Sequence, residues 1–208
     1  MVAQIKDRAD ALWWPLALTL ILVGYFSPWL SHSTNGLTQI GLDLSEWVKF
    51  MPQMQSGELP NRDMFYIPPI TLGAALALLS VGQTGWRPWI LRGLGLFVAL
   101  LALPSVDAIR FEGSDQWLPR VLMIAFVGAV ALMSVWIGRF PRWVSWGSLI
   151  LVGCVGLFVP TYLFSVIYRV AEEWLVVDFQ VGLGIWLNGL GHAAVIGLAV
   201  LSAVGRSR

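Results

Sequence analysis

Asn188 and His192 have the most specific chemistry in this sequence, because they are polar residues within a long apolar run at 181–204. His192 lies near the middle of the run, where a membrane-spanning helix crosses the centre of the bilayer. The two residues are four positions apart, so their side chains share one face of a helix. Polar groups at this depth are costly unless they are paired, and they are candidates for a functional site.

Three interpretations of the pair remain open. In the one we favour, Asn188 and His192 hydrogen-bond to each other or to backbone carbonyls of neighbouring helices. In the second, a neutral His192 imidazole binds the metal of a haem or chlorin, and the amide oxygen of Asn188 accepts from its other ring nitrogen. In the third, the pair lines a proton or solute path. Gly189, Ala193 and Gly197 form a small-xxx-small stripe on the same run, a pattern typical of close helix packing.

Other chemically active residues are sparse. His32 lies about half a bilayer from His192, too far for both to bind one metal. We therefore expect His32 to be an exposed loop histidine rather than a second haem ligand. Cys154, the single cysteine, is set in an apolar run and is expected to pack as a small hydrophobe. The sequence predicts no metal site. It has no zinc-protease, hydrolase-elbow, P-loop or dinucleotide-binding motif in a suitable context, so we expect no enzymatic activity.

Six apolar runs must position these residues. They cover 12–30, 66–82, 89–103, 118–138, 144–165 and 181–204. Most reach or approach the ~20 residues with which a helix crosses the hydrocarbon core. The chain is 57% hydrophobic and only 12% charged, against about 25% charged in soluble domains. This pattern predicts an all-α polytopic membrane protein, with one domain over 1–208 and three antiparallel hairpins at 12–82, 89–138 and 144–204.

The charges that flank the runs are sorted by side. The basic ends carry Lys6, Arg8, Arg87, Arg92, Arg139, Arg142, Arg206 and Arg208, with Asp7 and Asp10. The opposite ends carry Lys49, Arg62, Arg110, Arg120 and Arg169, with Asp43, Glu46, Glu58, Asp63, Asp107, Glu112, Asp115, Glu172, Glu173 and Asp178. By the positive-inside rule, we expect a cell-membrane protein with both termini in the cytoplasm and acidic loops outside.

The outer segments have structure of their own. Residues 40–51 place apolar side chains on one helical face, which predicts a short amphipathic helix on the bilayer or across the mouth of the bundle. Tryptophans near both sets of ends, Trp29 among them, are expected to anchor at the headgroup level. Pro28, Pro104 and Pro160 are expected to mark the outer ends of helices. The outer charges are expected to form a rim that faces water.

These features favour a non-catalytic integral subunit of a larger membrane assembly, such as a transport or energy-transducing complex. The expected partners are the lipid bilayer and other membrane subunits or a second copy of the chain, and no basic patch indicates a nucleic acid. One alternative is a small-solute or ion channel or carrier, whose acidic mouth would concentrate cations. Another is a subunit that binds haem or chlorin through His192; otherwise no cofactor is expected.

Overall fold

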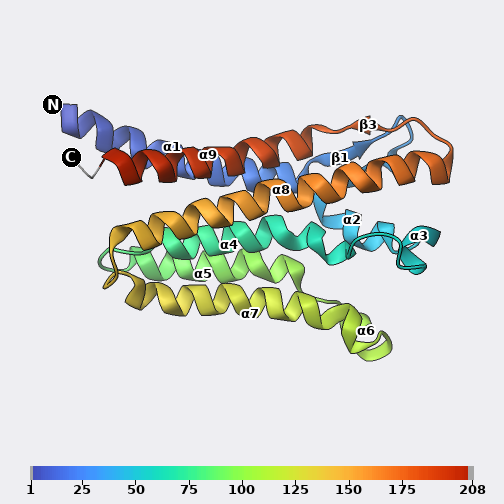
Figure 1. The fold of residues 1–208 in the computed structure, drawn as a ribbon, viewed down its shortest axis with the longest axis horizontal. Helices are drawn as coiled ribbons and strands as arrows, with labels where there is room; N and C mark the ends of the chain where they lie inside the picture. The colour runs from blue at the N-terminus through green and yellow to red at the C-terminus, as the bar shows by residue number, and fades with distance from the viewer. Residues whose placement is uncertain (1, 206–208) are drawn as a thin grey trace.

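The helices lie roughly along one axis in the computed structural model, which describes residues 2–205 and the side chains of 12–34, 36–141 and 143–204 (Figure 1). The α-helices are α1 (Val2–Phe26), α2 (Gly41–Val48), α3 (Pro52–Gln55), α4 (Ile67–Leu79), α5 (Arg87–Ala99), α6 (Val106–Phe111), α7 (Ser114–Ile137), α8 (Arg142–Leu175) and α9 (Leu183–Gly205). Short 3₁₀ segments are η1 (Asn35–Leu37), η2 (Arg62–Tyr66) and η3 (Leu100–Ala102), and the strands are β1 (Pro28–Ser31), β2 (Gln39–Ile40) and β3 (Gln180–Val181). Arg206 and Arg208, which contribute to the charge asymmetry, lie outside the described residues.

Three helices are long and apolar enough to cross a membrane: Ser114–Ile137 in α7, Trp143–Leu175 in α8 and Leu183–Val204 in α9. A shorter apolar helix, Leu12–Phe26, lies in α1. Their length and apolar composition indicate a mostly helical membrane protein. The helices at the runs 66–82 and 89–103 are shorter than those runs, since α4 and α5 have 13 residues each. The helix α5 begins at Arg87, before the second run, and ends at Ala99.

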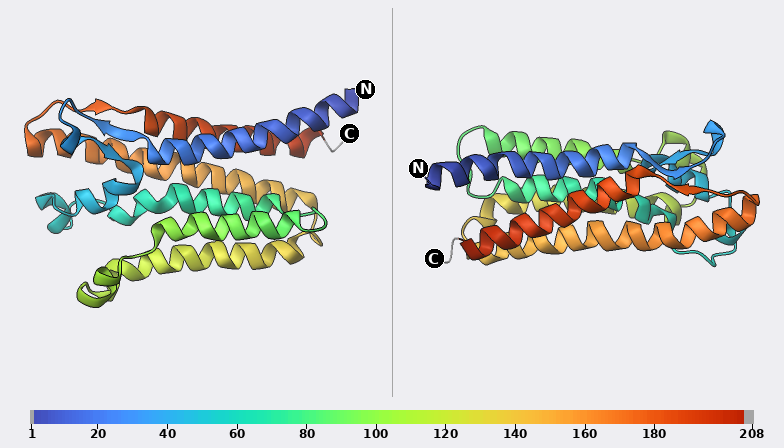
Figure 2. Two further views of the ribbon diagram at one scale, coloured as in Figure 1. Left: turned by 180° about the vertical axis from the view of Figure 1, so that it is seen from behind. Right: turned by 90° about the horizontal axis from the view of Figure 1, so that it is seen from above.

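The two ends of the molecule differ. The N- and C-termini lie at one end, together with the connections from α4 to α5 and from α7 to α8 (Figure 1). The three strands, α2, α3 and α6 lie at the opposite end, in both Figure 1 and Figure 2. We call this second end the capped end.

Glycines set the closest helix contacts. The helix α1 packs along α9, and a Cβ on Gly191 of α9 would lie 2.7 Å from the backbone nitrogen of Ile21 in α1. The helix α4 lies between α5, α7 and α8. Gly73 and Gly95 face each other across α4 and α5, and a Cβ on either would lie 2.5 Å from the carbonyl oxygen of the other. These backbones approach as closely as they do only because neither residue has a side chain.

The capped end holds a small sheet that the sequence pattern did not predict. The expected first span, 12–30, ends as a helix at Phe26, and Pro28 begins β1. A residue before proline is biased toward extended backbone, and proline has no N–H to continue the helix. β1 pairs antiparallel with β2 on one side and with β3 on the other, so the last run begins with a strand before α9.

The segment predicted as an amphipathic helix forms α2 and lies across the end of the bundle. Its apolar face buries Leu44 and Val48 in a core cluster with Trp29 and Phe65. Trp29 was expected to anchor at the headgroup level, and that prediction is wrong. Its side chain is fully buried under α2. Its ring meets those of Phe65 and Phe164 edge-on, and its indole N–H donates to the carbonyl of Gly24 at 2.9 Å.

The helix α8 continues ten residues beyond the expected end of its span. Pro160 was expected to end a helix and instead lies inside α8. Proline removes only one N–H, which would have bonded to the carbonyl of Gly156, and the packed neighbours of α8 keep the helix intact. The helix ends at Leu175, and the next residue, Val176, has a left-handed backbone with φ of 55°.

Candidate functional site

His192 lies inside the bundle with both ring nitrogens engaged. Its side chain is 1% exposed, its Nδ1 lies 2.9 Å from the carbonyl oxygen of Asn188, and its Nε2 lies 2.9 Å from the hydroxyl of Thr71 on α4. Because a carbonyl oxygen only accepts, Nδ1 must carry a proton. In the neutral imidazole, Nε2 then accepts from the Thr71 hydroxyl, which also lies 2.9 Å from the carbonyl of Ile67.

Asn188 contributes its backbone and not its side chain to this site. Its amide is fully buried, and neither its nitrogen nor its oxygen has a hydrogen-bond partner among the described residues. In the haem or chlorin interpretation, the amide oxygen of Asn188 accepts from the imidazole. In the structure, the backbone carbonyl of Asn188 occupies that position instead. The amide is a buried polar group that remains available to bond with something else.

The arrangement does not fit a tetrapyrrole. An axial ligand needs a free imidazole nitrogen with open space beyond it, but Nε2 of His192 faces Thr71. Gly156 of α8 closes the same side: a Cβ added there would overlap the imidazole ring and lie 2.7 Å from the Thr71 hydroxyl. Thr71, Gly156 and His192 join α4, α8 and α9 at this point. Haem or chlorin binding is therefore not part of the function proposed below.

A second cluster of polar groups lies at the capped end. Arg120 of α7 is 4% exposed, and its Nε donates to Asp63 at 2.7 Å. Its Nη1 lies 2.7 Å from Glu46 of α2, and its guanidinium stacks over the ring of Tyr66 at 4.6 Å. Arg62 adds contacts of 3.5 Å to Glu46 and 3.6 Å to Glu112. We call Glu46, Arg62, Asp63, Tyr66 and Arg120 the charged network.

The sequence pattern had placed these charges on a solvated rim, which is wrong for Arg62, Asp63 and Arg120, since all three are buried. One signal pointed to the network: Arg120 falls inside the predicted span 118–138. An arginine within an apolar run needs a partner. Its partners are far away in sequence, so the pattern could not name them. The network joins α2, η2 and α7 at one end of the bundle.

Glu46 makes the capped end sensitive to acid. Partial burial raises the pKa of its carboxyl, but hydrogen bonds from Lys49 and Arg120 outweigh this and lower it from 4.5 to about 2. A carboxyl with a lowered folded-state pKa stabilises the fold fully above its ordinary value and loses that contribution as the pH falls. We expect the melting temperature to fall between pH 4.5 and about 2. Thermal unfolding in detergent measures it.

The matched comparison uses two glutamates. Glu46→Gln should flatten the decline in melting temperature between pH 4.5 and about 2, because the titrating group has gone. Glu58→Gln changes an exposed residue outside the charged network and should leave the decline as it is. If both variants kept the wild-type acid profile, Glu46 would not be its source.

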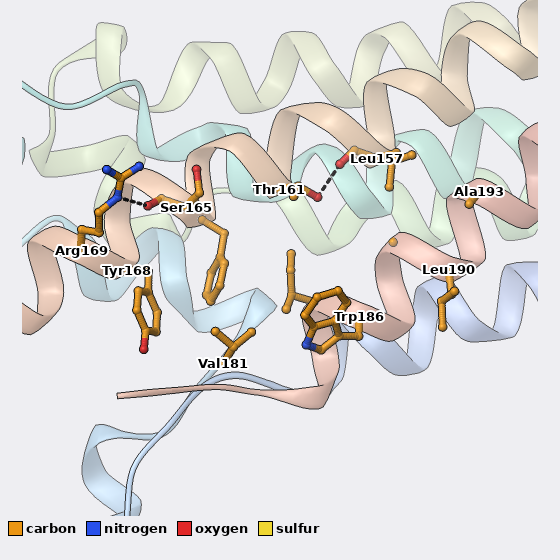
Figure 3. A pocket seen from close by; sticks show the side chains of 12 residues that line it. Leu157, Thr161, Ser165, Tyr168, Arg169, Val181, Trp186, Leu190 and Ala193 are labelled. Atoms are coloured by element: carbon orange, nitrogen blue, oxygen red, sulfur yellow. Dashed lines mark hydrogen bonds between the residues drawn. The ribbon is translucent and has the colours of Figure 1, made fainter. Parts of the chain in front are cut away.

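An apolar groove runs between α8 and α9 (Figure 3). It has a volume of about 530 Å³. Arg169 and Tyr168 lie at one end, and Leu157, Leu190 and Ala193 lie at the other. Gly189 and Ala193 of the small-residue stripe line this groove, whereas Gly197 lines a second apolar groove of about 300 Å³ between α1 and α9. The stripe thus lies on the outside of α9, and glycines on other faces make the close contacts within the chain.

The remaining candidates have local partners. His32 is half-buried beside β1, accepts at Nδ1 from the backbone of Thr34 and packs edge-on against Phe179. Cys154 is a free, half-buried thiol. Among the described residues, no group of three His, Cys, Asp or Glu side chains lies close enough to hold one metal ion.

Comparisons of the chain with family models, with curated proteins and with solved structures gave no match.

Proposed function

We propose that this chain is a non-catalytic integral subunit of a larger membrane assembly, with six membrane spans and a partner helix docked on the face of α1 and α9. The observation that carries the proposal is the open groove at Gly197. A Cβ added to Gly197 meets nothing within 4 Å among the described atoms. Trp13 and Leu201, on the walls of this groove, are exposed.

Six spans require α4 and α5 to reach across the bilayer. The 13 residues of α4 rise about 20 Å, and α5 with η3 reaches about 25 Å. Both are shorter than a hydrocarbon core of about 30 Å, a mismatch that local thinning of the bilayer accommodates.

The proposed orientation follows the charges. Arg87 is the first residue of α5, and Arg139 belongs to the connection from α7 to α8. Both segments lie at the end that holds the termini. The acidic residues other than Asp7 and Asp10 belong to segments at or near the capped end. Placing the capped end outside the cell therefore satisfies the positive-inside rule.

The interior supports a scaffold rather than a catalyst. The imidazole of His192 and the guanidinium of Arg120 are both bonded within the chain. A helix that docks on α9 gains close backbone contact where the surface residue is glycine. The helix α9 borders two apolar grooves, one with α8 and one with α1. The proposed partner helix occupies the groove between α1 and α9.

Gly197→Leu tests this docking surface. The leucine meets open space in the free chain, so the chain should fold normally but lose its partner. In mild detergent, the native protein should migrate as an assembly of fixed composition, and the variant as a free chain. Native mass spectrometry measures both.

Gly147→Leu is the matched control, because a Cβ at Gly147 of α8 also meets nothing within 4 Å. It should leave the assembly intact. A wild-type protein that runs as a monomer with no stoichiometric partner, or a Gly197→Leu variant that stays fully assembled, contradicts the proposal.

One observation favours a second candidate, a carrier of a small solute or ion. The Asn188 amide and the Tyr25 hydroxyl are buried without hydrogen-bond partners among the described residues. Polar groups of this kind line hydrated paths. Flux through liposomes that Asn188→Leu and His192→Leu abolish would favour the carrier over the scaffold, and flux that neither variant changes would remove this path.

A further inference from the structure

The groove between α8 and α9 is built for hydrocarbon. Its walls include Phe164, Ile185 and Trp186. Three hydroxyls also line it, and each donates to a backbone carbonyl. Thr161 donates to Leu157 at 2.6 Å, Ser165 to Tyr162 at 2.7 Å, and Tyr168 to Phe179. The groove therefore presents no free hydroxyl donor along its length, and its occupant must be apolar there.

The depth of the groove in a bilayer follows from the length of α8. Leu157 lies about 22 Å along the helix from Arg142, and Arg169 lies about 40 Å along it. A bilayer has a hydrocarbon core of about 30 Å and measures about 40–45 Å with its headgroups. If Arg142 lies at one headgroup layer, Leu157 lies within the core and Arg169 lies at the opposite headgroup layer.

The charges beyond the groove have a definite order. Arg169 is exposed and donates to the carbonyl of Ser165 at 3.4 Å, and no carboxylate among the described side chains lies within ion-pair distance of it. Glu173 is also exposed and lies one turn further toward the end of α8, on the same helical face. A positive charge therefore lies next to the hydrocarbon, and a negative charge lies about 6 Å further out.

We propose that this groove binds one phosphatidylethanolamine molecule from the leaflet at the capped end. An acyl chain fills the groove, the phosphate pairs with Arg169, and the ammonium faces Glu173. The order of charge in this headgroup, anionic phosphate first and cationic amine outside it, complements the order on α8. Phosphatidylglycerol has the phosphate but no amine, so it satisfies only Arg169. The proposal is independent of any partner helix at Gly197.

The test uses the full chain in lipid nanodiscs that contain equal amounts of phosphatidylethanolamine and phosphatidylglycerol with identical acyl chains. Native mass spectrometry counts the lipids that remain bound after the disc is removed. The wild type should retain one phosphatidylethanolamine. Arg169→Gln should lower retention of both lipids at least five-fold. Glu173→Gln should retain lipid but lose the preference between the two headgroups.

Two further variants separate the groove from the membrane in general. Ala193→Phe fills the groove from an exposed position on α9 and should abolish retention while the melting temperature stays near the wild-type value. Arg139→Gln removes an exposed arginine at the other end and should change nothing. Wild-type protein without retained lipid, or Arg169→Gln with wild-type retention, overturns the proposal. So does a dimer that Ala193→Phe dissociates, because a second copy would then occupy the groove.

Discussion

Arg120→Leu is expected to lower the free energy of unfolding by about 3–5 kcal/mol, the cost of removing one partner from a buried ion pair. The reason is that the substitution leaves the buried carboxylate of Asp63 without its ion pair. This carboxylate is 4% exposed, and its 2.7 Å hydrogen bond from Arg120 is its only ion pair among the described side chains. Without the guanidinium, a buried charge loses its compensation. Denaturant unfolding in detergent measures the change.

The double variant Arg120→Leu/Asp63→Leu separates the charge from the packing. It removes both charges at once, so it should be less destabilised than Arg120→Leu alone. Lys49→Ala breaks a 3.0 Å pair with Glu46 on a partly exposed surface and should cost about 0–1 kcal/mol. Equal destabilisation in the single and double variants would show that Arg120 acts through its apolar contacts and not through its charge.

The helices could be predicted because their signal is local. Length and hydropathy alone identify the long runs, and α7, α8 and α9 fall within or extend them. The sheet at the capped end was missed since its three strands have two to four residues each, too few for an alternating pattern to stand out. The burial of Trp29 was missed for a related reason. An indole at the end of an apolar run has the same pattern whether it meets lipid or a cap folded over it.

The candidate site was likewise predicted only in its local part. The four-residue spacing of Asn188 and His192 predicts one helical face, and the structure joins His192 to the Asn188 backbone on that face. The other partners, Thr71 and Gly156, come from α4 and α8. No pattern in one sequence links positions so far apart. The charged network fails for the same reason, because Glu46, Asp63 and Arg120 meet only after folding.

Gly156→Ala is expected to destabilise the bundle by about 1–3 kcal/mol, the usual result of adding atoms to a filled core. The new methyl would overlap the His192 ring and lie 2.7 Å from the Thr71 hydroxyl, so either α8 or the imidazole must move. Movement of the imidazole breaks the 2.9 Å contact with Thr71, which links α9 to α4. Thermal unfolding measures the cost, and nitrogen NMR of the histidine ring reports whether Nε2 has lost its donor.

Two controls assign the effect to His192. Gly147→Ala is the same change in the same helix at a position where a Cβ meets nothing within 4 Å, and it should be neutral or stabilise by about 0.5–1 kcal/mol. In a His192→Ala background, Gly156→Ala should cost much less, because the overlapping ring atoms are absent and the two effects are coupled. If Gly156→Ala costs the same with and without the imidazole, the clash lies elsewhere in α8, and His192 does not lock the three helices.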